Sequence, residues 1–221
     1  MTDTLLRDAR RDAYETARPG VQALVPVSAR RILDLGCAAG ELGAALKARQ
    51  GAEVVGVELS SDYAADARRR LDRVECGDVA TVLADPTIDL GHFDCVIAAD
   101  VLEHLVDPWS ALRDAVVLLA PGGHAVVSLP NVQYLLVLWQ LIRRGSWPRE
   151  PAGLFDATHL RWFTLRDARE LLEGAGLDVM AVEPQYWFAP GWQLEVARTL
   201  ARTSLAPFLP GQYVLLGRRR A

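Results

Sequence analysis

Short apolar runs recur along this chain of 221 residues, and most of them end in an acidic residue or a glycine. Such runs are typical of parallel strands that are buried on both faces. Between them, residues 41–48 and 111–120 carry apolar side chains at helical spacing, and Thr164 to Asp167 form the pattern of a capping box that begins another helix. The alternation of strands and helices predicts an α/β fold. The expected strands are 32–35, 54–58, 74–76, 93–100, 124–129, 177–182 and 212–216.

The segment from Ile32 to Gly40 is the most informative part of the chain. Its apolar run contains Asp34, two glycines four residues apart follow, and a helix is expected to begin at Glu41. Glycine lets the backbone turn tightly and approach a ligand, and the N-terminus of the helix faces the same turn. This arrangement predicts a cradle for a polar cofactor. A dinucleotide-binding turn would need glycine at Ala38 and at Glu41, so binding of a pyrophosphate is disfavoured.

The pattern D-x-G-x-A-x-G at 34–40 resembles the first motif of class I S-adenosylmethionine-dependent methyltransferases, in which glycine usually stands where this chain has Ala38. Glu58 ends the next strand, 24 positions after Asp34. That place is close to where a strand-turn-helix-strand unit puts a carboxylate that binds ribose hydroxyls. The resemblance also implies that Asp78 binds the adenine amino group, although a loop cap is an equally good interpretation of this residue.

Further motifs narrow the resemblance. The segments DVLEHL (100–105), DPW (107–109), PGG (121–123), SLPN (128–131) and THLRWFT (158–164) are similar to bacterial methyltransferases related to the ubiquinone-biosynthesis O-methyltransferases, many of which accompany glycosyltransferases. The similarity covers roughly residues 12–183. It implies a Rossmann-like sheet of seven mostly parallel strands in the order 3-2-1-4-5-7-6, with helices on both faces and insertions after strands 5 and 6. DNA amino-methyltransferases are disfavoured, because Asp100 is not followed by Pro-Pro and an aromatic residue.

The resemblance implies S-adenosylmethionine as the cofactor. Tyr14 and Arg18, ahead of the first strand, are expected to close over its methionine end, where the Arg18 guanidinium would match the carboxylate charge; an exposed N-terminal helix is the alternative. Asp100 is expected to support the same end. The expected cofactor-binding residues are Tyr14, Arg18, Asp34, Gly36, Cys37, Ala38, Gly40, Glu58, Leu59, Asp78, Val79, Ala99 and Asp100.

Two histidines are candidates for the general base that a hydroxyl acceptor needs, because the hydroxyl loses a proton as the methyl group arrives. His104 follows the fourth strand, and His159 lies in the first insertion beside Asp156; either can instead only fix a loop or a helix. Asp100, Glu103 and His104 also resemble an E-x-x-E-H cluster that binds a divalent metal in some ubiquinone-pathway methyltransferases. Because Glu103 and His104 are adjacent and would point to different sides of a helix or turn, we expect no metal here.

Two insertions, 131–162 and 185–210, are candidates for a cap, a substrate-binding element or an interface. Residues 132–142 of the first are almost wholly apolar, yet about eleven residues are too few to span a bilayer. A helix buried over the active site is the favoured interpretation. The alternative is docking on a membrane surface, helped by Trp139, Arg143, Arg144 and Trp147. In the second insertion, residues 186–188 and Trp192 either line the same pocket or form a dimer face.

Composition and charge fit one catalytic domain spanning residues 1–221. Hydrophobic residues make up 51% of the chain, enough for one sizeable core. The net charge of -4 gives no basic field for nucleic acid, so we expect a small-molecule substrate. Cys37, Cys76 and Cys95 form no C-x-x-C pair, which fits reduced, buried thiols. Residues 1–11 lack the apolar core of a signal peptide, so we expect a cytoplasmic protein.

The sequence therefore predicts an enzyme that methylates a hydroxyl of a sugar, a phenol or another small intermediate. We expect no contact with nucleic acid or membrane, and the chain either forms a homodimer or acts alone. An N-methyltransferase acting on a small amine is the main alternative, since a neutral amine needs no base. An NAD-dependent oxidoreductase is disfavoured by Ala38 and Glu41, and a non-catalytic methyltransferase-like partner protein by Gly40 and Glu58.

Overall fold

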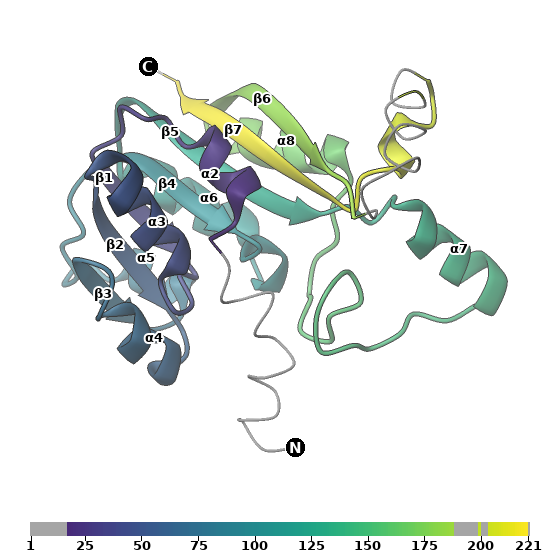
Figure 1. The fold of residues 1–221 in the computed structure, drawn as a ribbon, viewed down its shortest axis with the longest axis horizontal. Coiled ribbons are helices and arrows are strands. Elements are labelled where there is room, and N and C mark those ends of the chain that lie inside the picture. Colours follow the sequence, from purple (N-terminus) through teal and green to yellow (C-terminus); the bar gives the residue numbers. More distant parts are fainter. Residues whose placement is uncertain (1–16, 188–198, 200–202, 221) are drawn as a thin grey trace.

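The computed structural model describes residues 17–187, 199 and 203–220, and its centre is a seven-stranded sheet (Figure 1). The strand order β3-β2-β1-β4-β5-β7-β6 confirms the predicted order. Neighbours among β1 to β5 pair in parallel, whereas β7 runs antiparallel to both β5 and β6. The strands are β1 (Arg31–Leu35), β2 (Glu53–Glu58), β3 (Arg73–Cys76), β4 (Phe93–Ala99), β5 (Leu119–Pro130), β6 (Leu177–Gln185) and β7 (Gln212–Arg219).

Helices cover both faces of this sheet, as expected. One face carries α2 (Pro19–Leu24), α3 (Glu41–Gln50) and α4 (Ser61–Ala67), and the other carries α5 (Val79–Ala84), α6 (Pro108–Val117) and α8 (Leu165–Gly174). Ile32 and Leu33 are adjacent in β1 and fully buried, and they belong to different core clusters. The strand is therefore buried on both faces, which explains its unbroken apolar run.

The helix ends follow local chemistry. Helix α3 lies between Gly40 and Gly51, both in the left-handed conformation. The predicted capping box at the start of α8 is confirmed, with Thr164 and Asp167 exchanging hydrogen bonds. The predicted bounds of α6 were wrong: the helix spans Pro108–Val117, not 111–120. Asp107 caps its start, and Leu119 already belongs to β5, where it pairs with Phe93.

Strand β5 begins earlier than predicted because the Pro121-Gly122-Gly123 segment is an irregularity within it. The register with β4 shifts from Phe93 opposite Leu119 to Cys95 opposite His124, and Gly122 adopts a positive φ of 74°. At its other end, β5 pairs with β7, so that Gln212 lies opposite Pro130. The start of β7 therefore reaches the carboxyl edge of the parallel strands.

The first insertion contains α7 (Leu135–Arg144), which lies beyond the carboxyl end of β5 (Figure 1). The prediction of a buried helix was wrong: Val137 is the buried residue of α7, and most of its other apolar side chains are exposed. Two short 3-10 helices, η1 (Leu102–His104) and η2 (Ala206–Phe208), complete the described elements. Within the described residues, no helix has the length and apolar character of a membrane span.

The cysteines are free thiols, as expected, but their burial differs from the prediction. Cys37 and Cys95 are buried, whereas Cys76 is exposed. Cys76 ends β3, a strand that has β2 on one side only. The position at the end of an edge strand explains its exposure.

Candidate functional site

A cavity of about 400 Å³ opens at the carboxyl ends of β1 and β4, where open α/β sheets bind their ligands. Its walls come from the start of α2, the turn between β1 and α3, the end of β4 with η1, the segment 152–159 and the facing ends of β6 and β7. The cavity therefore joins segments from both halves of the chain. The predicted site residues that line it are Arg18, Asp34, Gly36, Cys37, Ala38, Ala99, Asp100, His104 and His159.

The remaining predicted residues lie outside this lining. Leu59 is exposed, Val79 is buried, and Tyr14 lies outside the described residues. Asp78 caps α5, since its Oδ1 accepts a hydrogen bond of 3.0 Å from the backbone of Thr81. The cap agrees with one of the two interpretations of Asp78 and leaves its second carboxylate oxygen for another partner. Gly40 and Glu58 do not line the cavity; Gly40 belongs to the turn between β1 and α3, and Glu58 bonds to its backbone.

The turn between β1 and α3 has a backbone shape that favours glycine at three positions. Gly36, Ala38 and Gly40 have φ values of 65°, 46° and 84°. A Cβ atom on Gly36 would collide with Val101. Ala38 is the non-glycine residue among the three, and it takes the left-handed conformation at a cost that glycine would avoid. This geometry explains in physical terms why alanine is an unusual residue at this place.

Glu58 holds the turn from the end of β2. Its carboxylate is 8% exposed and accepts hydrogen bonds from the backbone N–H of Ala38 at 2.9 Å and of Ser60 at 2.8 Å. Burial raises the pKa of Glu58, and these backbone donors oppose the rise. Each carboxylate oxygen retains a lone pair, so the group can still accept bonds from a bound ligand.

Asp100 is the centre of a polar network at the end of β4. It has a φ of 57°, forms an ion pair with Arg18, and accepts hydrogen bonds from Gln212 and, at 2.6 Å, from Ser128. Nearby Asp34 is buried, and its Oδ2 has no hydrogen-bond partner within the described part of the chain. Burial and Glu58 raise the pKa of Asp34 to about 7, and Arg18 opposes the rise. Since Asp34 lines the cavity, its second oxygen is suited to a ligand donor.

Glu103, His104 and His159 lie together at the other side of the cavity. Two backbone bonds attach the insertion to η1, because Leu160 and Arg161 both donate to the carbonyl of Glu103, at 2.9 and 3.0 Å. The His159 Nε2 atom lies 4.0 Å from Glu103 Oε1, and the two imidazole rings are 4.7 Å apart. The expectation that adjacent Glu103 and His104 would point apart was wrong: one ligand atom from each of the three residues lies within 4.8 Å of the others.

The protonation tendencies in this cluster follow from burial. Glu103 is 1% exposed, and neither of its carboxylate oxygens has a hydrogen-bond partner within the described residues. Burial, with repulsion from Asp100, raises its pKa well above the ordinary value. Burial and the nearby His104 lower the pKa of His159, so its imidazole is neutral at neutral pH. The Nδ1 atom of His104 interacts with Thr158 Oγ1 at 3.0 Å.

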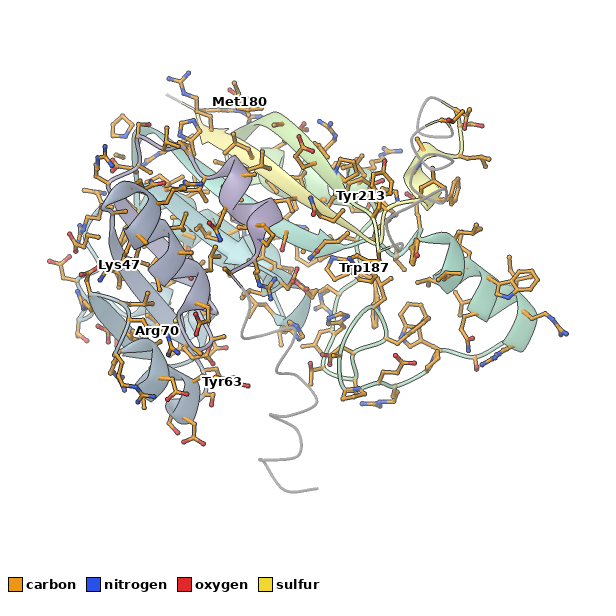
Figure 2. All side chains as sticks on the ribbon, in the orientation of Figure 1. Lys47, Tyr63, Arg70, Met180, Trp187 and Tyr213 are labelled. Carbon is orange, nitrogen blue, oxygen red and sulfur yellow. The ribbon has the colours of Figure 1, made fainter. Side chains whose placement is uncertain are left out.

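Sequence reasoning missed several residues of the cavity. Gln185 and Gln212 come from the facing ends of β6 and β7. Trp187, which follows β6, was not missed: it lines the cavity, in agreement with one of the two interpretations of residues 186–188, whereas Phe188 and Trp192 lie outside the described residues. Trp187 and Tyr213 lie near the end of this hairpin (Figure 2). A signal for Gln212 existed: a polar residue that begins an antiparallel strand beside a parallel one lies at the ligand-binding edge. Ser128, which donates to Asp100 but does not line the cavity, belongs to the SLPN motif, yet nothing in the sequence indicated this contact of a buried strand residue.

Comparisons with known proteins agree with this architecture. A protein-family model described as a methyltransferase domain matches residues 9–182. A ubiquinone biosynthesis O-methyltransferase from Alkalilimnicola ehrlichii is 35% identical over 156 residues, which cover 58% of this chain and 62% of that protein, less than two thirds of its length. A solved structure of an S-adenosylmethionine-dependent methyltransferase from Thermotoga maritima, described as a possible histamine N-methyltransferase, aligns with a TM-score of 0.66 at 20% identity and covers 98% of this chain and 94% of that one.

A second solved structure shows the same fold with a ligand. It is an N-methyltransferase from Bradyrhizobium japonicum in complex with S-adenosylhomocysteine, and it aligns with a TM-score of 0.58 at 17% identity. The alignment covers 96% of this chain and 87% of that chain. At these identities the two solved structures establish the fold.

Proposed function

This chain belongs to the methyltransferase-domain family, and on that premise we propose that it transfers a methyl group from S-adenosylmethionine to a hydroxyl group of a small molecule. One observation carries the proposal: the glycine turn with its acidic residues and the two histidines open into a single cavity. A cofactor site and an acceptor site must share one space for direct transfer. The similarity to ubiquinone biosynthesis O-methyltransferases supports a hydroxyl acceptor.

The residues that line the cavity, with Glu58 and Asp78 outside its lining, fit the cofactor. When bound, S-adenosylmethionine supplies a methyl group on a cationic sulfonium, which is its own leaving group. We assign the ribose hydroxyls to Glu58, the ammonium to Asp100 and the unpartnered oxygen of Asp34, and the carboxylate to Arg18. The backbone of Gly36, Cys37 and Ala38 would lie along the cofactor, with Ala99 beside it, and the free oxygen of Asp78 would bind the adenine amino group.

We assign the role of general base to His159. Its imidazole is neutral and lines the cavity. A neutral imidazole within reach of the acceptor hydroxyl can take its proton as the methyl group arrives. His104 is the second candidate for this role, although its Nδ1 is already engaged by Thr158. Trp187 and segment 152–159 line the same space, where they would limit the access of water during the reaction.

A second candidate mechanism uses a divalent metal at Glu103, His104 and His159. The observation that favours it is the closeness of their ligand atoms, together with the unbonded oxygens of buried Glu103. Carboxylate and imidazole ligands suit such an ion, which would lower the pKa of the acceptor hydroxyl. Asp100, which the sequence resemblance placed in this cluster, is instead bound by Arg18, Ser128 and Gln212.

The test is methyl transfer from labelled S-adenosylmethionine to a panel of sugars, phenols and amines, with and without a chelator. Labelled O-methyl products that form equally well with the chelator are the expected result. Activity lost with the chelator and restored by one divalent ion would select the metal mechanism. Transfer to amines alone would overturn the hydroxyl assignment, and failure to bind S-adenosylmethionine in calorimetry would overturn the proposed function.

A further inference from the structure

Helix α7 presents its apolar face to solvent. Leu135, Trp139 and Ile142 are spaced so that they share one face of the helix, and they are 54%, 59% and 81% exposed. Leu136, at the margin of this face, is 60% exposed. A surface helix of a folded domain normally turns such a stripe toward the core. Here the single buried residue, Val137, lies on the opposite side, so the stripe is left for another surface.

The base of α7 is nevertheless fixed to the body of the protein. Tyr134, Val137 and Leu154 form a small buried cluster, against which Trp147 and Phe155 pack. Tyr134 also contacts Trp187 of the cavity wall, with ring centroids 6.1 Å apart. The helix is therefore anchored on one side while its apolar side faces outward.

Positive charge accompanies the apolar face. Residues 130–149 contain three arginines, at positions 143, 144 and 149, and no acidic residue, whereas the whole chain has a net charge of -4. Arg143 and Arg144, in the last turn of α7, are exposed and form no ion pair within the described residues. Exposed leucine, isoleucine and tryptophan side chains next to unpaired arginines are typical of helices that lie in the interface of a membrane with anionic lipids.

We propose that the α7 docking face, made of Leu135, Leu136, Trp139, Ile142 and Arg143, binds the surface of a membrane that contains anionic lipids. Arg144 adds positive charge from the last turn, on the side of Val137. The apolar side chains would enter the headgroup region, and the arginines would lie at the level of the lipid phosphates. The charge distribution favours lipid over a second copy of this chain. Residues 130–149 of a second copy offer no carboxylate to meet the arginines, whereas an anionic bilayer supplies negative charge over its whole surface.

The experiment is flotation of the full chain with vesicles of phosphatidylcholine alone or mixed with phosphatidylglycerol. The parent should float with the mixed vesicles, and less so as salt is raised. The double variant Trp139→Gln/Ile142→Gln should bind at least about tenfold more weakly. Arg143→Gln should lose about fivefold on mixed vesicles, with no change on neutral ones, and adding Arg144→Gln should cost at most about fivefold more.

Met180→Gln is the matched control, since Met180 is a similarly exposed apolar residue, on β6, outside the docking face. It should bind vesicles like the parent, and all variants should keep the parent melting temperature. No flotation of the parent, or equal flotation of the Trp139→Gln/Ile142→Gln variant, would overturn the proposal. A dimer in sedimentation velocity that this variant abolishes would overturn it too, by assigning the face to a protein contact.

Discussion

The two halves of the cavity differ in how the chain builds them. One half consists of residues at the ends of consecutive strands, where the β1 turn and Glu58 are joined by the hydrogen bond from Ala38. The other half joins η1 to an insertion more than fifty residues later, through the backbone bonds to Glu103. The local sequence pattern around the strand ends therefore specifies the first half of the cavity. The second half depends on tertiary contacts between segments that are far apart in the sequence. Our assignments predict that changes in the first half alter cofactor affinity and that changes in the second half alter turnover.

The largest expected effect is in the second half. His159→Ala should lower turnover by about 10²- to 10⁴-fold, because the lost interaction belongs to the transition state. Cofactor affinity measured by calorimetry should stay close to that of the parent. The acidic limb of the parent pH–rate profile should lie below the ordinary histidine value, since burial lowers the pKa of His159, and this limb should vanish in the variant.

His92→Ala is the control for this experiment, because His92 is exposed and does not line the cavity. It should leave both turnover and the pH profile unchanged. His104→Ala, measured in parallel, distinguishes the two candidate bases. If His159→Ala and His104→Ala both keep parent turnover and a chelator has no effect, the second half of the cavity takes part in neither base nor metal catalysis.

In the first half, Asp34 should make stability depend on pH. Its folded pKa of about 7 lies above the ordinary value of 3.8, so the folded protein binds a proton that the unfolded chain releases. The stabilisation is complete below the unfolded pKa and is lost as pH rises through the folded pKa. Asp34→Asn should therefore gain stability relative to the parent between about pH 4 and 7, by at most about 4 kcal/mol, in denaturant titrations.

Asp72→Asn provides a control in which the stability difference from the parent has the opposite sign. Bonds from Lys47 and from the backbone of Val54 lower the pKa of Asp72. Its stabilisation is present above the unfolded pKa, so the asparagine variant should be less stable than the parent at neutral pH, with the difference shrinking as the pH falls. A parent–Asp34→Asn difference that does not change with pH would contradict the buried, unpartnered placement of Asp34.

Glu58→Ala tests whether the first half binds the cofactor. Removing the carboxylate should weaken S-adenosylmethionine binding by about 10- to 150-fold, the range for about 1.5 to 3 kcal/mol in hydrogen bonds to a charged group. Calorimetry measures this directly. Glu53→Ala, at the other end of β2 and exposed, should leave affinity unchanged. Equal affinities of parent and Glu58→Ala would contradict the ribose assignment.

The difference between the halves also explains what the sequence could predict. The strands follow from short apolar runs, the glycine turn from residues at fixed offsets and the strand order from the family resemblance, and the structure confirms all three. The burial of α7 was predicted wrongly, because periodicity reveals that a helix has an apolar face but not which surface covers it. The approach of His159 to Glu103 depends on backbone bonds from Leu160 and Arg161, and no local pattern encodes such contacts.

The smallest expected effect concerns Ala38. Its φ of 46° lies in the left-handed region, so Ala38→Gly relieves backbone strain and should raise stability by about 0.5 to 1 kcal/mol, or roughly 2 to 4 °C in melting temperature per kcal/mol. Ala39→Gly is the matched control: Ala39 has no positive φ, so glycine there should destabilise by about 0.5 to 1 kcal/mol. Two variants that differ by one position should thus shift the melting temperature in opposite directions. Equal destabilisation by both would show that the turn does not hold Ala38 in the left-handed conformation. That result would contradict the backbone geometry that we describe for the turn between β1 and α3.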